Sequence, residues 1–160
     1  MNLVGIGYDV HRFIEGRPLI LGGVEVAHTH GLDGHSDADV LAHAIADAVL
    51  GAIGERDIGH HFPNSDESIR GISSLEILRK VAQLVKSSGR RIVNIDATLI
   101  AEAPKISPHV SAMRTNLSEA LEIPVARVGV KATTNERMGF LGRGEGIAAM
   151  AVASVEQPEE

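Results

Sequence analysis

Asp9 and His11 are the first residues in this 160-residue chain whose types and spacing suggest chemistry. They lie two apart in a segment of alternating apolar residues, which is typical of a β-strand. Both side chains then share one face, with Cβ atoms about 7 Å apart. His43 follows on a predicted helix, on the face away from its apolar stripe. Two imidazoles and a carboxylate around an open position are a common catalytic zinc arrangement, so these residues form a candidate metal site.

A simpler interpretation is that Asp9 pairs locally and His43 lies on a solvated helix face. Two observations weigh against it. The strand face that carries Asp9 also carries Gly5 and Gly7, which suits close approach of a ligand better than a core. Ser36 is the predicted N-cap of the helix, and helix N-terminal amides bind phosphate. These two observations favour a metal site next to helix amides that can bind phosphate.

Composition limits the other classes of function. The chain has no cysteine, so any transition metal must be held by histidines and carboxylates. The net charge of -6 and the 2% aromatic content argue against a nucleic-acid surface. The sequence contains no apolar run that could span a bilayer and does not start like a signal peptide. We expect a cytoplasmic protein with no membrane or nucleic-acid partner.

Hydrophobic periodicity and turn residues predict the elements that position these side chains. The expected strands are residues 3–11, 18–21, 24–26, 92–101, 125–133 and 146–155. The expected helices run from Ser36 to Gly54, from a Ser73–Glu76 capping box to Gly89, and from Ser107-Pro108 to Leu121. Residues 27–35 and 55–72 are predicted loops, and the length of the second suggests a lid.

This order predicts a single α+β domain over residues 1–155, in which a mixed sheet carries helices on one face, with ferredoxin-like character. Residues 156–160 are expected to form a flexible tail. The last strand is rich in small residues, namely Ala148, Ala149, Ala151 and Ala153. Such a face requires close packing, either against a partner subunit or against a helix, and the sequence leaves both open.

Several blocks give the chain a family resemblance that runs nearly end to end. They are residues 7–11, 21–24, 34–40, 43–47, 57–59, 103–105, 130–134 and 142–146. On these blocks the chain resembles the 2-C-methyl-D-erythritol 2,4-cyclodiphosphate synthases of the non-mevalonate isoprenoid pathway. The resemblance implies an intramolecular phosphoryl transfer that releases CMP from a CDP substrate. It also implies a homotrimer with active sites between subunits, one Zn²⁺ per subunit and a second cation, Mg²⁺ or Mn²⁺.

The resemblance also implies roles for individual residues. Zinc would be held by Asp9, His11 and His43, and the second cation by Glu136; His35 and Thr134 would be catalytic. The residues implied in substrate binding are Ser36, Asp47, Asp57, Ile58, Gly59, Phe62, Pro63, Asn64, Ser65, Asp66, Ala101, Glu102, Ala103, Pro104, Lys105, Ile106, Ser107, Thr133 and Asn135. Phe140 and Arg143 fall where an isoprenoid diphosphate would bind on the trimer axis.

Each of these roles has a structural alternative. Lys105 could be a surface lysine, Thr133 and Thr134 ordinary strand residues, and Glu136 a solvated carboxylate. Arg143 could simply support the glycine-rich turn. No role is assigned to the adjacent imidazoles of residues 60 and 61.

Two other functions remain open on the sequence alone. One is a zinc hydrolase, which needs a general base near the metal, and only His35 or Asp57 is suitably placed. The other is a nucleotide-binding or assembly module in which the metal is structural. A site with an exchangeable position favours a catalyst over such a module.

Overall fold

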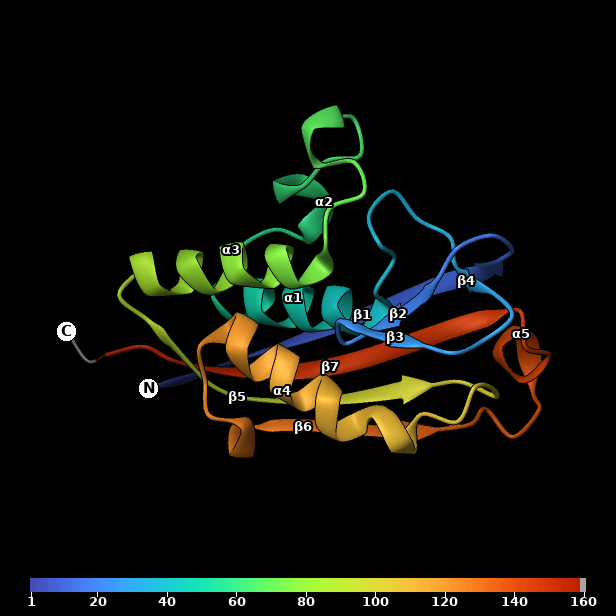
Figure 1. Ribbon diagram of the computed structural model, residues 1–160. Helices are drawn as coiled ribbons and strands as arrows, with labels where there is room; N and C mark the ends of the chain where they lie inside the picture. Colours follow the sequence, from blue (N-terminus) through green and yellow to red (C-terminus); the bar gives the residue numbers. More distant parts are fainter. Residues whose placement is uncertain (159–160) are drawn as a thin grey trace.

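A five-stranded mixed sheet forms the centre of the computed structural model, which describes residues 1–158 (Figure 1). Its strand order is β4-β1-β7-β5-β6, and only the β5–β6 pair is parallel. The strands are β1 (Asn2–Ile14), β4 (Gly31–Leu32), β5 (Arg91–Ile100), β6 (Val128–Thr133) and β7 (Gly146–Glu156). The predicted α+β fold with a mixed sheet is confirmed.

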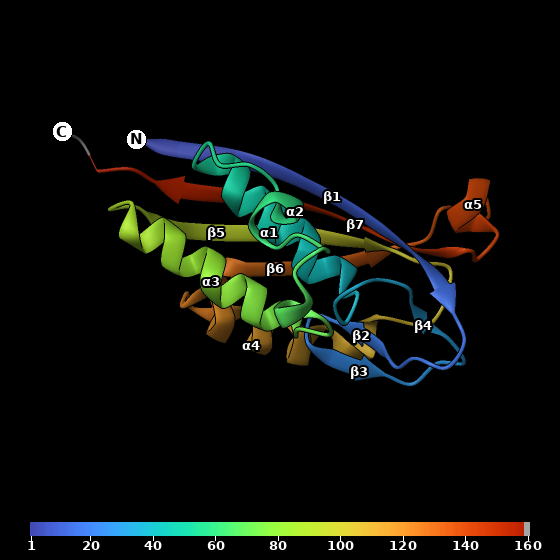
Figure 2. The ribbon, with the colours of Figure 1, turned by 90° about the horizontal axis from the view of Figure 1, so that it is seen from above.

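Three long helices cover one face of this sheet (Figures 1 and 2). They are α1 (Val40–Ala52), α3 (Ser74–Ser87) and α4 (Val110–Leu121). The shorter helices are α2 (Ile58–His61), η1 (Glu67–Ile69), η2 (Ser107–His109), η3 (Val125–Arg127) and α5 (Gly139–Gly142). The segment between α1 and α3, which includes α2 and η1, rises above these two helices on the side away from the sheet (Figure 1).

Helix α1 lies directly on the backbone of β1 because that strand offers glycines. A Cβ atom at Gly7 would lie 1.9 Å from the Ala44 carbonyl oxygen, and one at Gly5 would lie 2.0 Å from that of Ala48. Gly7 pairs across the strands with Ala151, which is also buried on this side. The small residues of β7 on this face are therefore covered by a helix, which decides between the two predicted kinds of packing.

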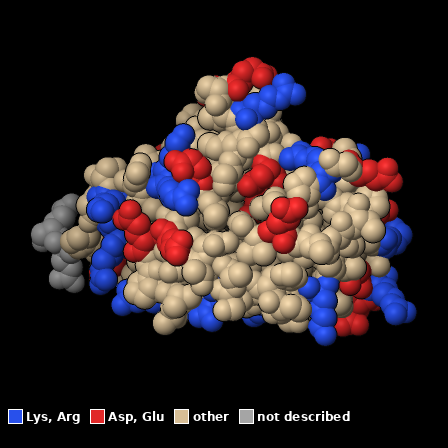
Figure 3. All heavy atoms as spheres, in the orientation of Figure 1, with Lys and Arg blue, Asp and Glu red and all other residues tan. Residues whose placement is uncertain are grey.

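The opposite face of the sheet carries exposed apolar side chains. They include Val4, Ile6 and Tyr8 of β1 and Met150 and Val152 of β7. Figure 3 shows acidic and basic groups interspersed over the face in view, without a broad basic surface on that face. Within residues 1–158, no helix is long and apolar enough to cross a bilayer.

A two-stranded hairpin, β2 (Leu19–Leu21) and β3 (Val24–Val26), confirms the turn predicted at Gly22-Gly23. Both glycines have positive φ, 56° and 70°, as a tight hairpin turn requires. Their amides donate to Asp39, at 2.9 Å from Gly22 and 2.7 Å from Gly23. Burial raises the pKa of this carboxyl group, and these backbone donors partly offset the effect. Asp39 thus joins the hairpin to the start of α1.

The start of α1 was predicted incorrectly. Asp39 is its N-cap and accepts from the Ala42 amide at 3.1 Å. Ser36 lies upstream of a left-handed residue, Ala38 with φ 57°, which cannot continue a helix. Ser36 instead belongs to a loop that folds back over the helix terminus.

Three further predictions need correction. Within the described residues, Ser73 occupies the N-cap of α3 but its hydroxyl makes no capping bond, so the capping box is absent. Ser107 begins the 3₁₀ turn η2, and α4 starts at Val110. The predicted tail is ordered at its start, because Glu156 pairs with Asn2 in the sheet and the Gln157 amide donates to the Met1 carbonyl at 2.9 Å. Residues 159 and 160 lie outside the described residues.

Candidate functional site

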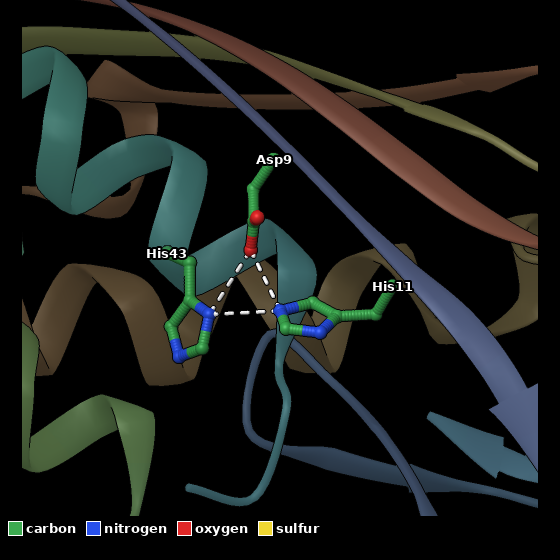
Figure 4. Close-up of side chains that lie close together, drawn as sticks. All are labelled: Asp9, His11 and His43. Atoms are coloured by element: carbon green, nitrogen blue, oxygen red, sulfur yellow. Dashed lines mark hydrogen bonds and ion pairs between the residues drawn. The ribbon is translucent and has the colours of Figure 1, made fainter. Parts of the chain in front are cut away.

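Asp9, His11 and His43 converge on one point between β1 and α1 (Figure 4). The Oδ2 atom of Asp9 lies 2.9 Å from His11 Nε2 and 3.0 Å from His43 Nδ1, and the two nitrogens are 3.2 Å apart. The alternation of β1 presents the first two residues on the helix side, and the first turn of α1 presents the third. One ligand atom from each residue lies within 4.8 Å of the others, which fits a metal site.

The electrostatics of this triad favour a cation. Burial acts to raise the pKa of Asp9, but hydrogen bonds from His11 and His43 outweigh it and hold that pKa well below its usual range. Burial likewise acts to lower the pKa of His11, yet the Asp9 carboxylate raises it overall. Asp9 is therefore charged at any working pH, and a bound ion would take the place of the imidazole protons.

The second ring nitrogen of His11 and that of His43 each lie within hydrogen-bond distance of another protein group. His11 Nδ1 lies 2.6 Å from the Asp33 carbonyl oxygen. His43 Nε2 lies 2.9 Å from the Ser74 hydroxyl and 3.1 Å from that of Ser36. These contacts leave His11 Nε2 and His43 Nδ1 for an ion, as in metal sites whose ligands are oriented by a second set of hydrogen bonds.

A cavity of about 270 Å³ opens beside the triad. Its lining contains the predicted residues Asp9, His11, His35, Ser36, His43, Asp47, Ile58, Gly59, Phe62 and Asn64, together with Gly34, Ile69, Ile72 and Ile77. The Nε2 atom of His35 is buried and has no hydrogen-bond partner among the described residues. A buried donor or acceptor without a partner suits a ligand that completes its bonding.

Four residues predicted for this side do not line the cavity. Asp57 caps α2 through the His60 amide at 3.0 Å, and Asp66 caps η1 through the Ser68 amide at 3.0 Å. Pro63 and Ser65 are exposed on the same loop.

Asp47 connects the cavity to that loop. Its Oδ1 atom accepts from the Ile58 amide at 2.8 Å. Burial raises the pKa of Asp47, the Ile58 amide opposes this, and the charges of Asp57 and Asp9 add to the rise. The structure shows that Asp47 anchors α2, and its contact with a ligand stays a prediction.

Most of the other predicted residues line a second cavity, of about 290 Å³, where the parallel strands β5 and β6 end. It is lined by Ala101, Glu102, Pro104, Lys105, Ile106, Ser107, Ala132, Thr133 and Thr134. Glu102 joins the adjacent loops, because its Oε1 atom accepts from the amides of Asn135 at 2.9 Å and Arg137 at 3.1 Å. Ala103 and Glu136 are exposed beside it. Among the described residues, the two cavities share no lining residue.

A third cavity, of about 690 Å³, lies beyond the metal triad. Phe140, His11 and Glu145 contribute to its lining. Arg143 is not in that lining; its Nε atom pairs with Glu145 Oε1 at 3.2 Å.

Three residues near the triad were not predicted: Arg17, Asp37 and Ser74. The Arg17 guanidinium donates to the carbonyl oxygens of Gly34 and Ser36, both at 2.6 Å. It therefore fixes the backbone on either side of His35. No spacing in the sequence indicates this, because a loop and a hairpin separate Arg17 from the segment it holds.

Comparison with known proteins supplies the family. The sequence model of the YgbB family matches residues 2–156. The chain belongs to the YgbB family.

The chain is similar to curated proteins and solved structures over nearly its whole length. It is 60% identical to the 2-C-methyl-D-erythritol 2,4-cyclodiphosphate synthase of Alkalilimnicola ehrlichii, over 97% of this chain and 95% of that protein. It is 58% identical to the bifunctional enzyme IspD/IspF of Sphingopyxis alaskensis, over 98% of this chain but only 40% of that protein. The IspF CDP complex of Plasmodium falciparum superposes with a TM-score of 0.85 at 32% identity, covering 99% and 97% of the two chains.

Proposed function

We propose that this chain converts 4-diphosphocytidyl-2-C-methyl-D-erythritol 2-phosphate to 2-C-methyl-D-erythritol 2,4-cyclodiphosphate and CMP, a step in isoprenoid precursor synthesis. The observation that carries the proposal is the convergence of Asp9, His11 and His43 beside the His35 segment, in one cavity of a YgbB-family chain. A metal triad that shares a cavity with a buried imidazole nitrogen, His35 Nε2, which has no hydrogen-bond partner within residues 1–158, suits a phosphate ligand.

The chemistry requires little from the protein beyond alignment and charge neutralisation. An oxygen of the 2-phosphate attacks the β-phosphorus, the new P–O bond closes the ring, and the bond from the β-phosphorus to the bridging oxygen breaks to release CMP. The nucleophile is already an anion, so no strong general base is needed. Bound at the triad, Zn²⁺ would supply positive charge to the diphosphate.

The chain's own residues hold the reacting groups. His35 and Ser36 line the cavity, and the His35 Nε2 atom and the Ser36 hydroxyl would donate to phosphate oxygens. Gly59 lies at the cavity wall on α2, where its backbone would contact the methylerythritol part, with Asp57 at the start of the same helix. The loop of residues 62–66 would close over the substrate and exclude water.

The second cavity is the proposed cytidine site. Lys105 and Thr133 lie at its wall and would contact the nucleotide and its phosphates, and Thr134 would support the transferring phosphoryl group. Glu136 would hold the second cation, Mg²⁺ or Mn²⁺; it is exposed beside this cavity.

A homotrimer would bring the two half-sites together. Within one chain the metal cavity and the cytidine cavity are separate, and the sheet face opposite the helices exposes a row of apolar residues that includes Ile6, Tyr8 and Val152. Packing of these faces around an axis would bury them and place one subunit's cytidine cavity beside its neighbour's triad. Phe140 and Arg143 would then lie near the axis, where an isoprenoid diphosphate is the proposed regulator.

The test is CMP release from the CDP substrate by purified protein supplied with Zn²⁺ and Mg²⁺, followed by chromatography and ³¹P NMR. We expect the cyclic diphosphate and CMP in equal amounts, with no oxygen taken from labelled water. His43→Ala should abolish both products, whereas His28→Ala, which removes an exposed imidazole outside the cavity, should not. Incorporation of one labelled oxygen would identify a hydrolase instead.

A further inference from the structure

Ser74 contacts His43 on the side of the ring away from the metal triad, and Asp37 in turn contacts Ser74. His43 Nε2 lies 2.9 Å from the Ser74 hydroxyl, which in turn contacts a carboxylate oxygen of Asp37. The other oxygen of Asp37 accepts from the Ser74 amide at 3.0 Å. Ser74 is fully buried and His43 nearly so. Asp37, Ser74 and His43 therefore form a connected polar chain that reaches the imidazole at Nε2, the ring nitrogen that does not face Asp9 and His11.

The chemistry of the three groups sets the direction of the hydrogen bonds. An ionised carboxylate can only accept, so the hydroxyl proton of Ser74 is directed to Asp37. The Ser74 oxygen then offers its lone pair to His43 and accepts from Nε2–H. A metal-bound imidazole is neutral and has only this one proton, so Nδ1 would offer its lone pair to the ion in place of the hydrogen bond that it makes to Asp9 in the metal-free protein.

Ser36 does not impose the same direction. Its hydroxyl lies 3.1 Å from His43 Nε2 and accepts from the Ala38 amide at 3.1 Å. No carboxylate contacts the Ser36 hydroxyl among the described residues, so its proton stays free to turn toward a ligand in the cavity.

We propose that Ser74 and Asp37 are positioning residues of the metal centre, which fix the tautomer and ring orientation of His43 so that Nδ1 faces the ion. This inference rests on the metal site proposed above and adds residues that contact neither ion nor substrate. Outer partners of this kind hold a ligand ring in place and strengthen metal binding.

The same contacts connect the metal centre to the end of the loop. Ser74 is the first residue of α3, directly after the segment that forms one side of the cavity. The Asp37 amide donates to the Ile72 carbonyl at 3.2 Å, and the Gly71 amide donates to the His35 carbonyl at 3.1 Å. These hydrogen bonds fix the positions of the loop end, the His35 segment and the metal ligand His43 relative to one another.

A purely structural role is the competing explanation, because Asp37 also caps α3. The two roles separate in Ser74→Ala, which removes the hydroxyl but keeps the backbone amide that Asp37 accepts from. Ser73→Ala is the matched control, since Ser73 is the exposed neighbour whose hydroxyl makes no capping bond within residues 1–158.

The experiment measures Zn²⁺ affinity by chelator competition, with the visible spectrum of the Co²⁺-loaded protein as a second readout. Ser74→Ala should bind Zn²⁺ about 10- to 100-fold more weakly than the unmodified chain and should shift the Co²⁺ bands. Asp37→Asn should weaken binding in the same direction but less, because an amide no longer dictates which way the Ser74 proton points. The double variant should bind no more weakly than Ser74→Ala alone.

Each outcome has a distinct meaning. Affinity of Ser74→Ala equal to that of Ser73→Ala would overturn the inference while leaving the proposed function intact. Failure of the unmodified chain to bind Zn²⁺ would instead refute the metal site itself. If Ser74→Ala loses its thermal transition, Asp37→Asn decides the matter: unchanged affinity in a folded protein contradicts the inference, and weakened affinity with an unchanged transition supports it.

Discussion

The proposed metal side of this chain, around Asp9, His11 and His43, and its proposed nucleotide side, around Lys105 and Thr133, are built in different ways. At the metal side, three ligands from β1 and α1 lie within 3.2 Å of one another and are oriented by buried partners. At the nucleotide side, Lys105, Thr133, Thr134 and Glu136 are exposed at the ends of two parallel strands. One chain therefore brings the three proposed metal ligands together by its own packing, whereas the proposed nucleotide side remains an open surface.

The largest effect should come from breaking the metal side. Asp9→Asn removes the negative charge shared by His11 and His43, and a metal's contribution of several kcal/mol corresponds to a loss of about 10³-fold in kcat. Steady-state CMP release and zinc content check this together. An active Asp9→Asn variant with a full zinc complement would contradict the assigned role of the carboxylate.

Co-expression of two variants tests whether the proposed metal side and the proposed nucleotide side of one active site come from different subunits. Asp9→Asn impairs the metal side and Lys105→Glu the nucleotide side, so co-expressed subunits should regain activity well above the sum of the two separate preparations. Recovery follows because some sites then combine an intact half from each subunit. If the mixture is no more active than its components, each site is built within one chain and the subunit-sharing proposal is wrong.

The next effect concerns the packing that places His43 over β1. Gly7→Ala would force a Cβ atom to 1.9 Å from the Ala44 carbonyl oxygen, so we expect a loss of about 3 kcal/mol in the free energy of unfolding. Gly51→Ala, in α1, has ordinary space around it and should gain about 0.5–1 kcal/mol from helix propensity. Urea unfolding of both variants provides the measurement, and equal stabilities would contradict this account.

A smaller effect should follow from loosening the His35 segment. Arg17→Lys keeps the charge but cannot hold the Gly34 and Ser36 carbonyls with one planar group, so kcat should fall about tenfold. The control is Arg79→Lys on α3, where Arg79 makes an exposed ion pair with Glu76, and this variant should leave kcat unchanged. A rise in KM with unchanged kcat would instead indicate that Arg17 contacts substrate.

The smallest effect is a pH dependence of the metal-free protein. The lowered pKa of Asp9 contributes stability above that group's ordinary value of 3.8, and this is lost as the pH falls. The raised pKa of His11 contributes stability below its ordinary value of 6.5, and this is lost as the pH rises through the raised value. In thermal unfolding, the stability difference between the unmodified chain and Asp9→Asn should therefore be largest between pH 3.8 and pH 6.5. Zinc affinity should increase with pH, because the ion replaces protons on the ligands. A difference that is flat with pH would refute the coupling.

Much of the metal side could be predicted from local sequence rules. The two-residue alternation of β1 places Asp9 and His11 on one face, and the Gly22-Gly23 pair predicts the hairpin turn. Helix boundaries were less accurate, because Ser36 is a good N-cap by type, while the left-handed backbone of Ala38 and the contact of Asp39 with the hairpin move the start to Val40.

The sequence by itself determined the residue types of the triad, the alternation that aligns two of its members and the family blocks around them. The tertiary structure alone decided that the small face of β7 lies under α1, that Arg17 grips the His35 segment, and that Asp37 and Ser74 stand behind His43. The physical reason is separation along the chain. Periodicity and capping act over a few residues, whereas the Ser74 hydroxyl meets an imidazole 31 residues away only after α1 and α3 have packed together.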